Sequence, residues 1–125
     1  MDVTFTEREL DVMGVLWEHG PATVAEVQEQ MPDVLAYTTV LTILRTLEEK
    51  GHVRHEPEGR AYRYHPLVDR TAAGASALRR LVRKVFSGSP ELLLTQLVSE
   101  RGMTAKQLKR MQQLLEDRLD AKEGR

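Results

Sequence analysis

The sequence predicts a mainly α-helical protein with one small β-hairpin, followed by a helical C-terminal region. Six segments carry helix-start signals or apolar residues at helical spacing. Two further segments alternate with a period of two around a Pro-Glu-Gly-Arg run at residues 57–60. The chain has 125 residues, of which 41% are hydrophobic and 30% charged. This length fits one domain or a small domain with an appendage, and the composition excludes wholesale disorder.

The first three helices are predicted by capping residues and by apolar stripes. Thr6 with Glu9, and Thr23 with Glu26, have the spacing of a capping box, so we expect one helix from Thr6 to the Gly-Pro at 20–21 and a short one ending near residue 31. The third helix spans about residues 36–50. We expect its apolar stripe to face the core, together with the only tryptophan; these residues are Trp17, Tyr37, Val40, Leu41, Leu44 and Leu47.

A hairpin follows the third helix. Residues 53–56 and 61–65 are the predicted strands, and residues 57–60 are the predicted turn. Tyr62 and Tyr64 fall on the face opposite Arg63, so we expect both rings to pack on the core.

Three more helices are predicted after residue 67. One ends near the Ser-Gly at 87–88, one opens with Ser89 as its cap and Pro90 in its first turn, and the last is capped by Thr104 with Gln107. Their apolar stripes exceed what a 58-residue segment can bury on itself, so we expect a second copy of the chain to cover them in a two-fold homodimer. The predicted dimerisation residues are Leu78, Leu81, Val82, Val85, Phe86, Leu93, Leu97, Leu108, Met111 and Leu115.

Three helices followed by a hairpin is the order of a winged helix-turn-helix, in which the third helix enters the DNA major groove. We therefore expect residues 1–67 to be a DNA-binding domain and residues 68–125 a helical dimerisation domain. The outer face of the third helix has the short polar groups and the long donor that such contact requires. The predicted DNA-binding residues are Thr38, Thr39, Thr42, Arg45 and Thr46 in the helix, with Arg60 and Arg63 in the wing.

Each of these residues has an expected task. Thr38 and Thr39 lie near a helix N-terminus and are expected to bond phosphate oxygens, while the Thr42 methyl group meets a thymine methyl. Arg45 is the candidate for a bidentate bond to guanine, and Arg60 and Arg63 are candidates for phosphate contact. Repeated threonines lower helix propensity, which indicates selection for something other than helix stability.

Charge is segregated along the chain, although the formal net charge is only -1. Residues 1–37 have one base and eight acids, residues 38–66 have five bases and four acids, and the remainder has twelve bases and seven acids. The acidic excess therefore lies on the first two helices. The third helix and the hairpin are only slightly basic, so we expect modest affinity for DNA of any sequence.

Several classes of protein are excluded or disfavoured. The chain has no cysteine, which rules out disulfides, thiolate metal sites and iron–sulfur clusters. It lacks an apolar run long enough to span a membrane and a signal-peptide start, so we expect a cytoplasmic protein with no membrane partner. His52 and His55 fall on opposite faces of a strand, and no catalytic motif is present. We expect no enzymatic activity, metal or cofactor.

Three runs of residues resemble a known family. They are ELDVMGVLW at 9–17, LAYTTVLTILRTLEEKG at 35–51 and GRAYRYHP at 59–66, and FSGSP at 86–90 falls where the family turns into its dimerisation helices. In order and spacing the chain resembles the penicillinase-repressor (BlaI/MecI) family. The resemblance implies a homodimeric winged-helix repressor on a pseudo-palindromic operator that overlaps a promoter.

The resemblance also implies a partner that releases the repressor. In the best-known members a membrane-bound metalloprotease sensor of β-lactams triggers cleavage of an Asn-Phe bond in the dimerisation region, whereas this chain has Gln96-Leu97 there. A copper-sensing branch uses C-terminal cysteines, which this chain lacks. The inducing signal is left open.

Two alternatives remain open from the sequence. The acidic first two helices also suit a winged-helix module that binds protein rather than DNA. A regulator with a small-molecule pocket between its halves is the other alternative, although the chain shows no cluster of polar or histidine residues to line one.

Overall fold

The computed structural model describes residues 4–124 and has the predicted fold class, mostly helical with one small antiparallel sheet. Two compact units divide the chain, residues 1–79 and 80–125, and this division falls inside a helix. Within the described part, no helix is both long and apolar enough to cross a membrane.

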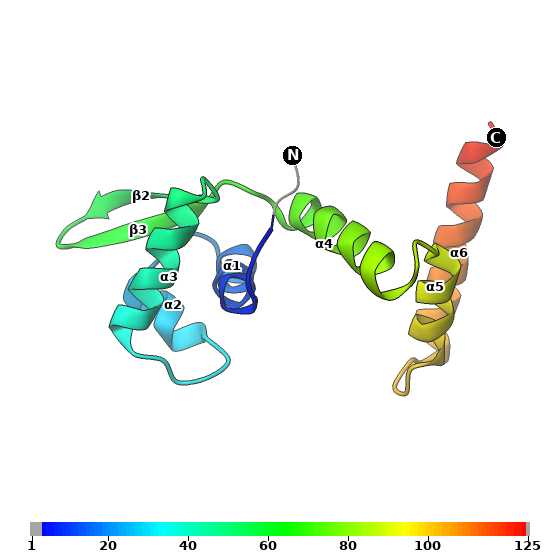
Figure 1. Ribbon diagram of the computed structural model, residues 1–125, viewed down its shortest axis with the longest axis horizontal. Coiled ribbons are helices and arrows are strands. Elements are labelled where there is room, and N and C mark those ends of the chain that lie inside the picture. The colour runs from blue at the N-terminus through cyan, green and yellow to red at the C-terminus, as the bar shows by residue number, and fades with distance from the viewer. Residues whose placement is uncertain (1–3, 125) are drawn as a thin grey trace. The chain divides into compact units, whose positions relative to one another are not determined.

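The first unit is built on three helices, α1 (Glu7–His19), α2 (Val24–Gln30) and α3 (Tyr37–Glu49) (Figure 1). Both predicted capping boxes are present: Thr6 accepts from the Glu9 amide and Thr23 from the Glu26 amide, and each glutamate accepts from the amide of its threonine. All three helices contribute fully enclosed side chains to one core, which contains Val12, Met13, Leu16, Val24, Val27, Val40, Leu44 and Leu47.

An ion pair between a buried glutamate and an exposed lysine joins the start of α1 to the end of α3. The side chain of Glu9 is only 4% exposed, and one of its oxygens lies 2.8 Å from Nζ of Lys50. Burial alone would raise the pKa of Glu9, but the hydrogen bonds from Lys50 and from the Thr6 amide outweigh it and hold that pKa below its ordinary value. The same carboxylate therefore caps one helix and fixes the end of another.

The sheet has three strands in the order β1-β3-β2, which places β3 (Ala61–Pro66) at its centre. Its neighbours are β1 (Ala22–Thr23) and β2 (Val53–Glu58), both antiparallel to it. The predicted turn of four residues is wrong, since the strands extend to Glu58 and Ala61 and leave only Gly59 and Arg60 in the loop. Gly59 has a φ of 62°, a conformation that glycine adopts without strain.

Two aromatic residues lie farther from the core than the sequence predicts. Tyr64 is buried as expected, but Tyr62 is 49% exposed and packs against His55 instead. Tyr37, the first residue of α3, is 48% exposed. Side chains lean towards the N-terminus of a helix, so a ring on the first residue extends beyond the helix rather than onto the core.

Trp17 holds the segment that leads out of the sheet. Its indole Nε1–H donates to the carbonyl of Val68 at 2.8 Å, and its ring meets Phe5 edge-to-face. Asp69 then caps the next helix, because its carboxylate accepts from the Ala72 amide at 2.7 Å. That helix is α4 (Arg70–Val85), whose Ala73 and Ser76 are buried.

The second unit contains the end of α4, then α5 (Pro90–Ser99) and α6 (Ala105–Lys122). Ser87 and Gly88 both have positive φ, which turns the chain sharply after α4. The predicted caps are confirmed at Ser89 and Thr104. No described residue of α5 or α6 is buried, and the exposed apolar residues of α4 to α6 include Leu78, Leu81, Val85, Leu97, Leu108 and Leu115, while Val82, Phe86, Leu93 and Met111 are half-buried.

We expect Glu9→Gln to destabilise the protein by about 1–2 kcal/mol at pH 7, because Gln cannot form the ion pair and Lys50 loses a charged acceptor. A lowered folded-state pKa adds stability above the ordinary value of 4.5, and that stability disappears as the pH falls through the lowered value. The difference in the free energy of unfolding between wild type and variant should therefore become smaller near pH 3. Urea unfolding at fixed protein concentration at the two pH values measures it.

The control is Glu7→Gln, which changes an exposed carboxylate in the first turn of the same helix. We expect it to alter stability by less than about 0.5 kcal/mol. A Glu9→Gln effect equal to that of the control would contradict the role given to the Glu9–Lys50 pair.

Candidate nucleic-acid interface

Helix α3 separates an apolar face from a polar one. Val40, Leu44 and Leu47 are buried in the core. The predicted DNA-binding residues gather on the opposite side, where Thr38, Thr39, Thr42 and Arg45 are exposed and Thr46 is half-buried. The helix thus presents four short side chains and one long cation along a single face.

Two threonines on this face use their hydroxyl hydrogens inside the helix. Thr42 Oγ1 donates to the carbonyl of Thr38 at 2.9 Å, and Thr46 Oγ1 donates to the carbonyl of Thr42 at 3.0 Å. Each hydroxyl keeps its lone pairs and each side chain keeps its methyl group. Towards a partner, Thr42 therefore offers a methyl group and a hydrogen-bond acceptor rather than a donor.

The N-terminus of α3 differs from the other helix starts among residues 4–124. Its N-cap is Ala36, which makes no side-chain cap. The remaining helices have a side chain that accepts from a first-turn amide, supplied by Thr6, Thr23, Asp69, Ser89 and Thr104. The start of α3 therefore keeps the positive end of the helix dipole beside Thr38, with no side-chain oxygen bound there.

The hairpin carries two of the predicted arginines in different surroundings. Arg60 lies in the two-residue loop and is exposed. Among the described residues, neither Arg60 nor Arg45 has a hydrogen-bond or ion-pair partner. Both guanidinium groups are available to an anionic or polar ligand.

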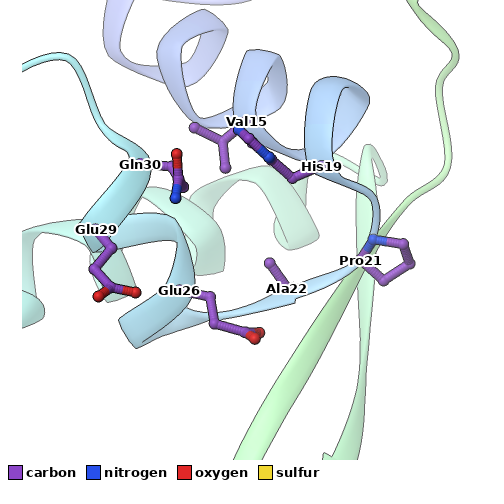
Figure 2. A pocket seen from close by; sticks show the side chains of 7 residues that line it. All are labelled: Val15, His19, Pro21, Ala22, Glu26, Glu29 and Gln30. Atoms are coloured by element: carbon purple, nitrogen blue, oxygen red, sulfur yellow. The ribbon is translucent and has the colours of Figure 1, made fainter.

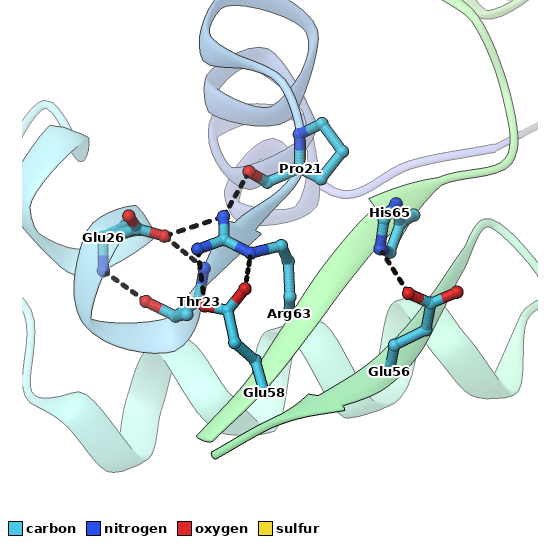
Figure 3. Close-up of polar contacts among 7 residues, drawn as sticks. All are labelled: Pro21, Thr23, Glu26, Glu56, Glu58, Arg63 and His65. Carbon is cyan, nitrogen blue, oxygen red and sulfur yellow. Dashed lines mark hydrogen bonds and ion pairs between the residues drawn. The ribbon is translucent and has the colours of Figure 1, made fainter. Parts of the chain in front are cut away.

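Arg63 is bound to other residues of the protein (Figure 3). Its Nε and Nη2 donate to the two oxygens of Glu58 at 2.8 and 2.7 Å, and its Nη1 donates to the Pro21 carbonyl at 2.8 Å. Glu26 lies 3.1 Å from the same group. The hydrogen bonds with Glu58 raise the pKa of Arg63 and lower that of Glu58. The geometry favours a structural task for Arg63, namely fixing β3 to the start of α2.

The surface between α1 and α2 has a small hollow of about 200 Å³ (Figure 2). It is lined by Val15, His19, Pro21, Ala22, Glu26, Glu29 and Gln30. Glu26 already accepts from the Thr23 amide and pairs with Arg63. Ligand pockets usually measure about 300–1,000 Å³ and are mostly apolar, so this hollow does not resemble a small-molecule site. Within residues 4–124 no three His, Asp or Glu side chains come together to hold a metal ion.

The exposure of one apolar residue in the loop before α3 could not be predicted from the sequence. Val34 is fully exposed in the loop before α3. Tyr37, the first residue of α3, is also exposed. Val34 interrupts no periodic pattern, so its exposure depends on where the loop lies in the folded chain.

A profile of the penicillinase repressor family matches residues 5–117, which is nearly the whole chain. The chain belongs to the penicillinase repressor family. The resemblance read from the three sequence runs is thereby confirmed.

Two characterised members of the family show the range of similarity. The penicillinase repressor of Bacillus licheniformis is 23% identical over 119 residues, which cover 94% of this chain and 93% of the relative. The transcriptional regulator BlaI of Mycobacterium tuberculosis is 36% identical over 98 residues, 75% of this chain and 71% of the relative. The family is thus one of transcriptional repressors.

The first unit is also similar to a solved structure. The DNA-binding domain of the repressor BlaI is 30% identical, with a TM-score of 0.51, and the match covers 58% of this chain and 93% of that domain. The prediction of a winged helix-turn-helix is confirmed by this likeness, and the β2–β3 hairpin is the wing.

We expect Arg63→Ala to lower the thermal unfolding midpoint, because Glu58 and Glu26 lose their cation and the Pro21 carbonyl loses a donor. Arg63→Lys should also lower it, since one ammonium group cannot replace the planar fork. Arg60→Ala, at the exposed tip, should leave the midpoint unchanged. Thermal melts followed by circular dichroism compare the three, and equal midpoints for Arg63→Ala and Arg60→Ala would refute the assignment.

Proposed function

We propose that this protein is a sequence-specific DNA-binding transcriptional repressor that acts as a homodimer on a pseudo-palindromic operator. The observation that carries the proposal is the outer face of α3, where exposed short side chains surround Arg45, which has no hydrogen-bond or ion-pair partner within residues 4–124. Membership of a repressor family and the likeness to a BlaI DNA-binding domain support it.

In this proposal α3 is the recognition helix. Its threonines are short enough to let the backbone approach base edges, and Arg45 reaches a guanine with two hydrogen bonds to O6 and N7. Because the Thr42 hydroxyl donates within the helix, its outward methyl group suits a thymine methyl.

Phosphate contacts set the register of the helix on the duplex. Thr38 and Thr39 lie at the uncapped start of α3, where a phosphate also meets the positive end of the helix dipole. Arg60 extends the contact from the wing to the flanking backbone. We assign Arg63 only an indirect part, through its hold on β3.

The acidic charge of the N-terminal segment makes base-specific contacts more important for DNA binding. The first 37 residues contain one base against eight acids, and six of these acids lie in α1 and α2. These helices repel DNA that approaches on the wrong side. Affinity for arbitrary DNA is then low, and specific binding depends on a few base contacts made twice in a dimer.

The second unit supplies the dimer contacts. A shallow, mostly apolar groove of about 340 Å³ is lined by Leu81, Val85, Phe86, Leu93, Gln96, Leu97 and Glu100. A two-fold pair of chains would cover such faces and place two recognition helices one helical turn of DNA apart, about 34–36 Å, or a multiple of it.

Release of the repressor would involve α5. Gln96 and Leu97 lie inside α5, and Leu97 also lines the apolar groove. A sensor protease acting there would have to unwind part of α5 first, because a helical peptide bond must open before it is cleaved. Cleavage would divide the dimerisation surface.

We expect the protein to form a salt-sensitive complex with duplex DNA from upstream of its own gene in a gel-shift assay. Arg45→Ala should remove about 5- to 150-fold of discrimination at one base pair. Arg60→Ala should weaken binding to all sequences and lower the salt slope by about one. Fluorescence anisotropy titrations between 50 and 200 mM salt would measure both effects. The affinity for DNA should change by about three orders of magnitude over this range.

The wild-type result decides between classes of function. Absence of any specific complex at about 50 mM salt would contradict DNA binding. Equal losses of specific and non-specific binding in Arg45→Ala would remove that residue from base recognition.

We expect Leu97→Asp to convert a dimer into a monomer, because it places a carboxylate in the apolar groove. Analytical ultracentrifugation measures the change. Leu10→Asp, at a leucine of similar exposure on α1, is the matched control and should leave the dimer intact. A monomeric wild type, or a Leu97→Asp variant that stays dimeric, would contradict the proposed surface.

A further inference from the structure

One polar contact connects the recognition helix directly to the wing. Glu48, near the end of α3, accepts from the backbone N–H of His55 in β2 at 3.2 Å. Its two oxygens also each lie 2.7 Å from Nδ1 of the His55 ring. A carboxylate only accepts, so Nδ1 carries the proton and donates to the Glu48 carboxylate.

The His55 ring is also packed against the neighbouring strand. His55 lies directly opposite Tyr64 in the β2–β3 ladder. Its ring centroid is 5.6 Å from that of Tyr64 and 4.5 Å from that of Tyr62. The imidazole thus lies between a carboxylate of α3 and two aromatic rings of β3, so its orientation is set by both elements.

The wing beyond His55 has little other support on this face. Val53 and Tyr64, at the base of the hairpin, are buried, whereas Pro57 and Tyr62 are exposed. The three residues from His55 to the end of β2 extend about 10 Å towards the loop that carries Arg60. A small rotation at His55 would therefore displace Arg60 by a larger distance.

The opposite face of the hairpin is held differently. There Arg63 bonds Glu58 and the Pro21 carbonyl, which ties β3 to the strand and helix that precede α3. In the part of the chain that the structure describes, Arg54 pairs with Glu56 within β2 itself and bonds no other element. Among the described residues the Glu48–His55 contact is the side-chain hydrogen bond that joins α3 to the wing.

We propose that His55 is a positioning residue for DNA binding: held by Glu48, it fixes the wing relative to the recognition helix so that Arg60 reaches phosphate while Arg45 occupies the groove. This inference rests on the DNA-binding function proposed above. Without the Glu48–His55 contact the wing tip samples more orientations. Binding of Arg60 to phosphate must then also order the tip, which weakens the contribution of Arg60 to affinity. The Arg45 contact, on α3 itself, is unaffected.

The test measures how much Arg60 contributes with and without the contact. In the wild-type background, Arg60→Ala should weaken operator binding about 3- to 10-fold and lower the salt slope by about one. In a His55→Ala background, Arg60→Ala should weaken operator binding by less than about 2-fold and leave the salt slope unchanged. Arg45→Ala should carry the same penalty in both backgrounds, which a general loss of folding would not produce.

Two further variants separate positioning from mere packing. His55→Gln keeps a side-chain donor for Glu48 and should restore most of the Arg60 penalty. Arg54→Ala, on the other face of the same strand, is the matched control and should leave that penalty at its wild-type value. If His55→Ala fails to fold, Glu48→Ala breaks the same contact from the helix side.

A measurement without DNA makes the proposal independent of the operator. Backbone ¹⁵N relaxation on the full chain should show lower order parameters for residues 58–61 in His55→Ala, but not in Arg54→Ala. Unchanged order parameters, or a full Arg60 penalty in the His55→Ala background, would overturn the positioning role. Absence of DNA binding by the wild type would overturn the proposed function instead, while the relaxation result would still decide whether the contact orders the wing.

Discussion

The central position of β3 is the constraint on which the first unit depends. As the middle strand of three, it must pair on both edges while its alternate side chains serve different neighbours. Tyr64 points into the core formed with the three helices, and Arg63 points to the opposite face, where it binds Glu58 and the chain before α2. A slip of one residue in register would exchange these two side chains, burying a guanidinium and exposing the ring. The wing therefore has one register compatible with both the core and the ion pairs.

Features that depend on near neighbours in the chain were predictable from the sequence. The capping boxes at Thr6, Thr23 and Thr104 involve residues three apart, so their spacing alone identifies them. The division of α3 into an apolar and a polar face follows from helical periodicity, which also brings Thr38, Thr42 and Arg45 to one side. The family was predictable for the same reason, because its motifs are local.

Features that depend on distant contacts were not predictable. Strand β1 has only two residues and exists because β3 lies beside it, so no alternating pattern could reveal it. The wing loop is shorter than expected because Pro57 lies in an edge strand, where a missing amide is tolerated. Arg63 looked like a free cation, yet its partner Glu26 is 37 positions away and its Pro21 carbonyl is 42 away. Which arginines are free and which are bound is a property of the folded chain.

The indole of Trp17 gives this protein a built-in optical reporter. It is the only tryptophan of the chain, and its Nε1–H is bonded to the Val68 carbonyl just before α4 begins. Tryptophan emission shifts with the polarity and hydrogen bonding around the indole, so the whole signal comes from one junction. Detachment of the segment that leads to α4 would change the emission spectrum even where the three-helix core stays intact. Loss of this contact can thus be followed separately from loss of helix in unlabelled protein, with far-ultraviolet dichroism reporting the helices and fluorescence reporting the Trp17–Val68 junction.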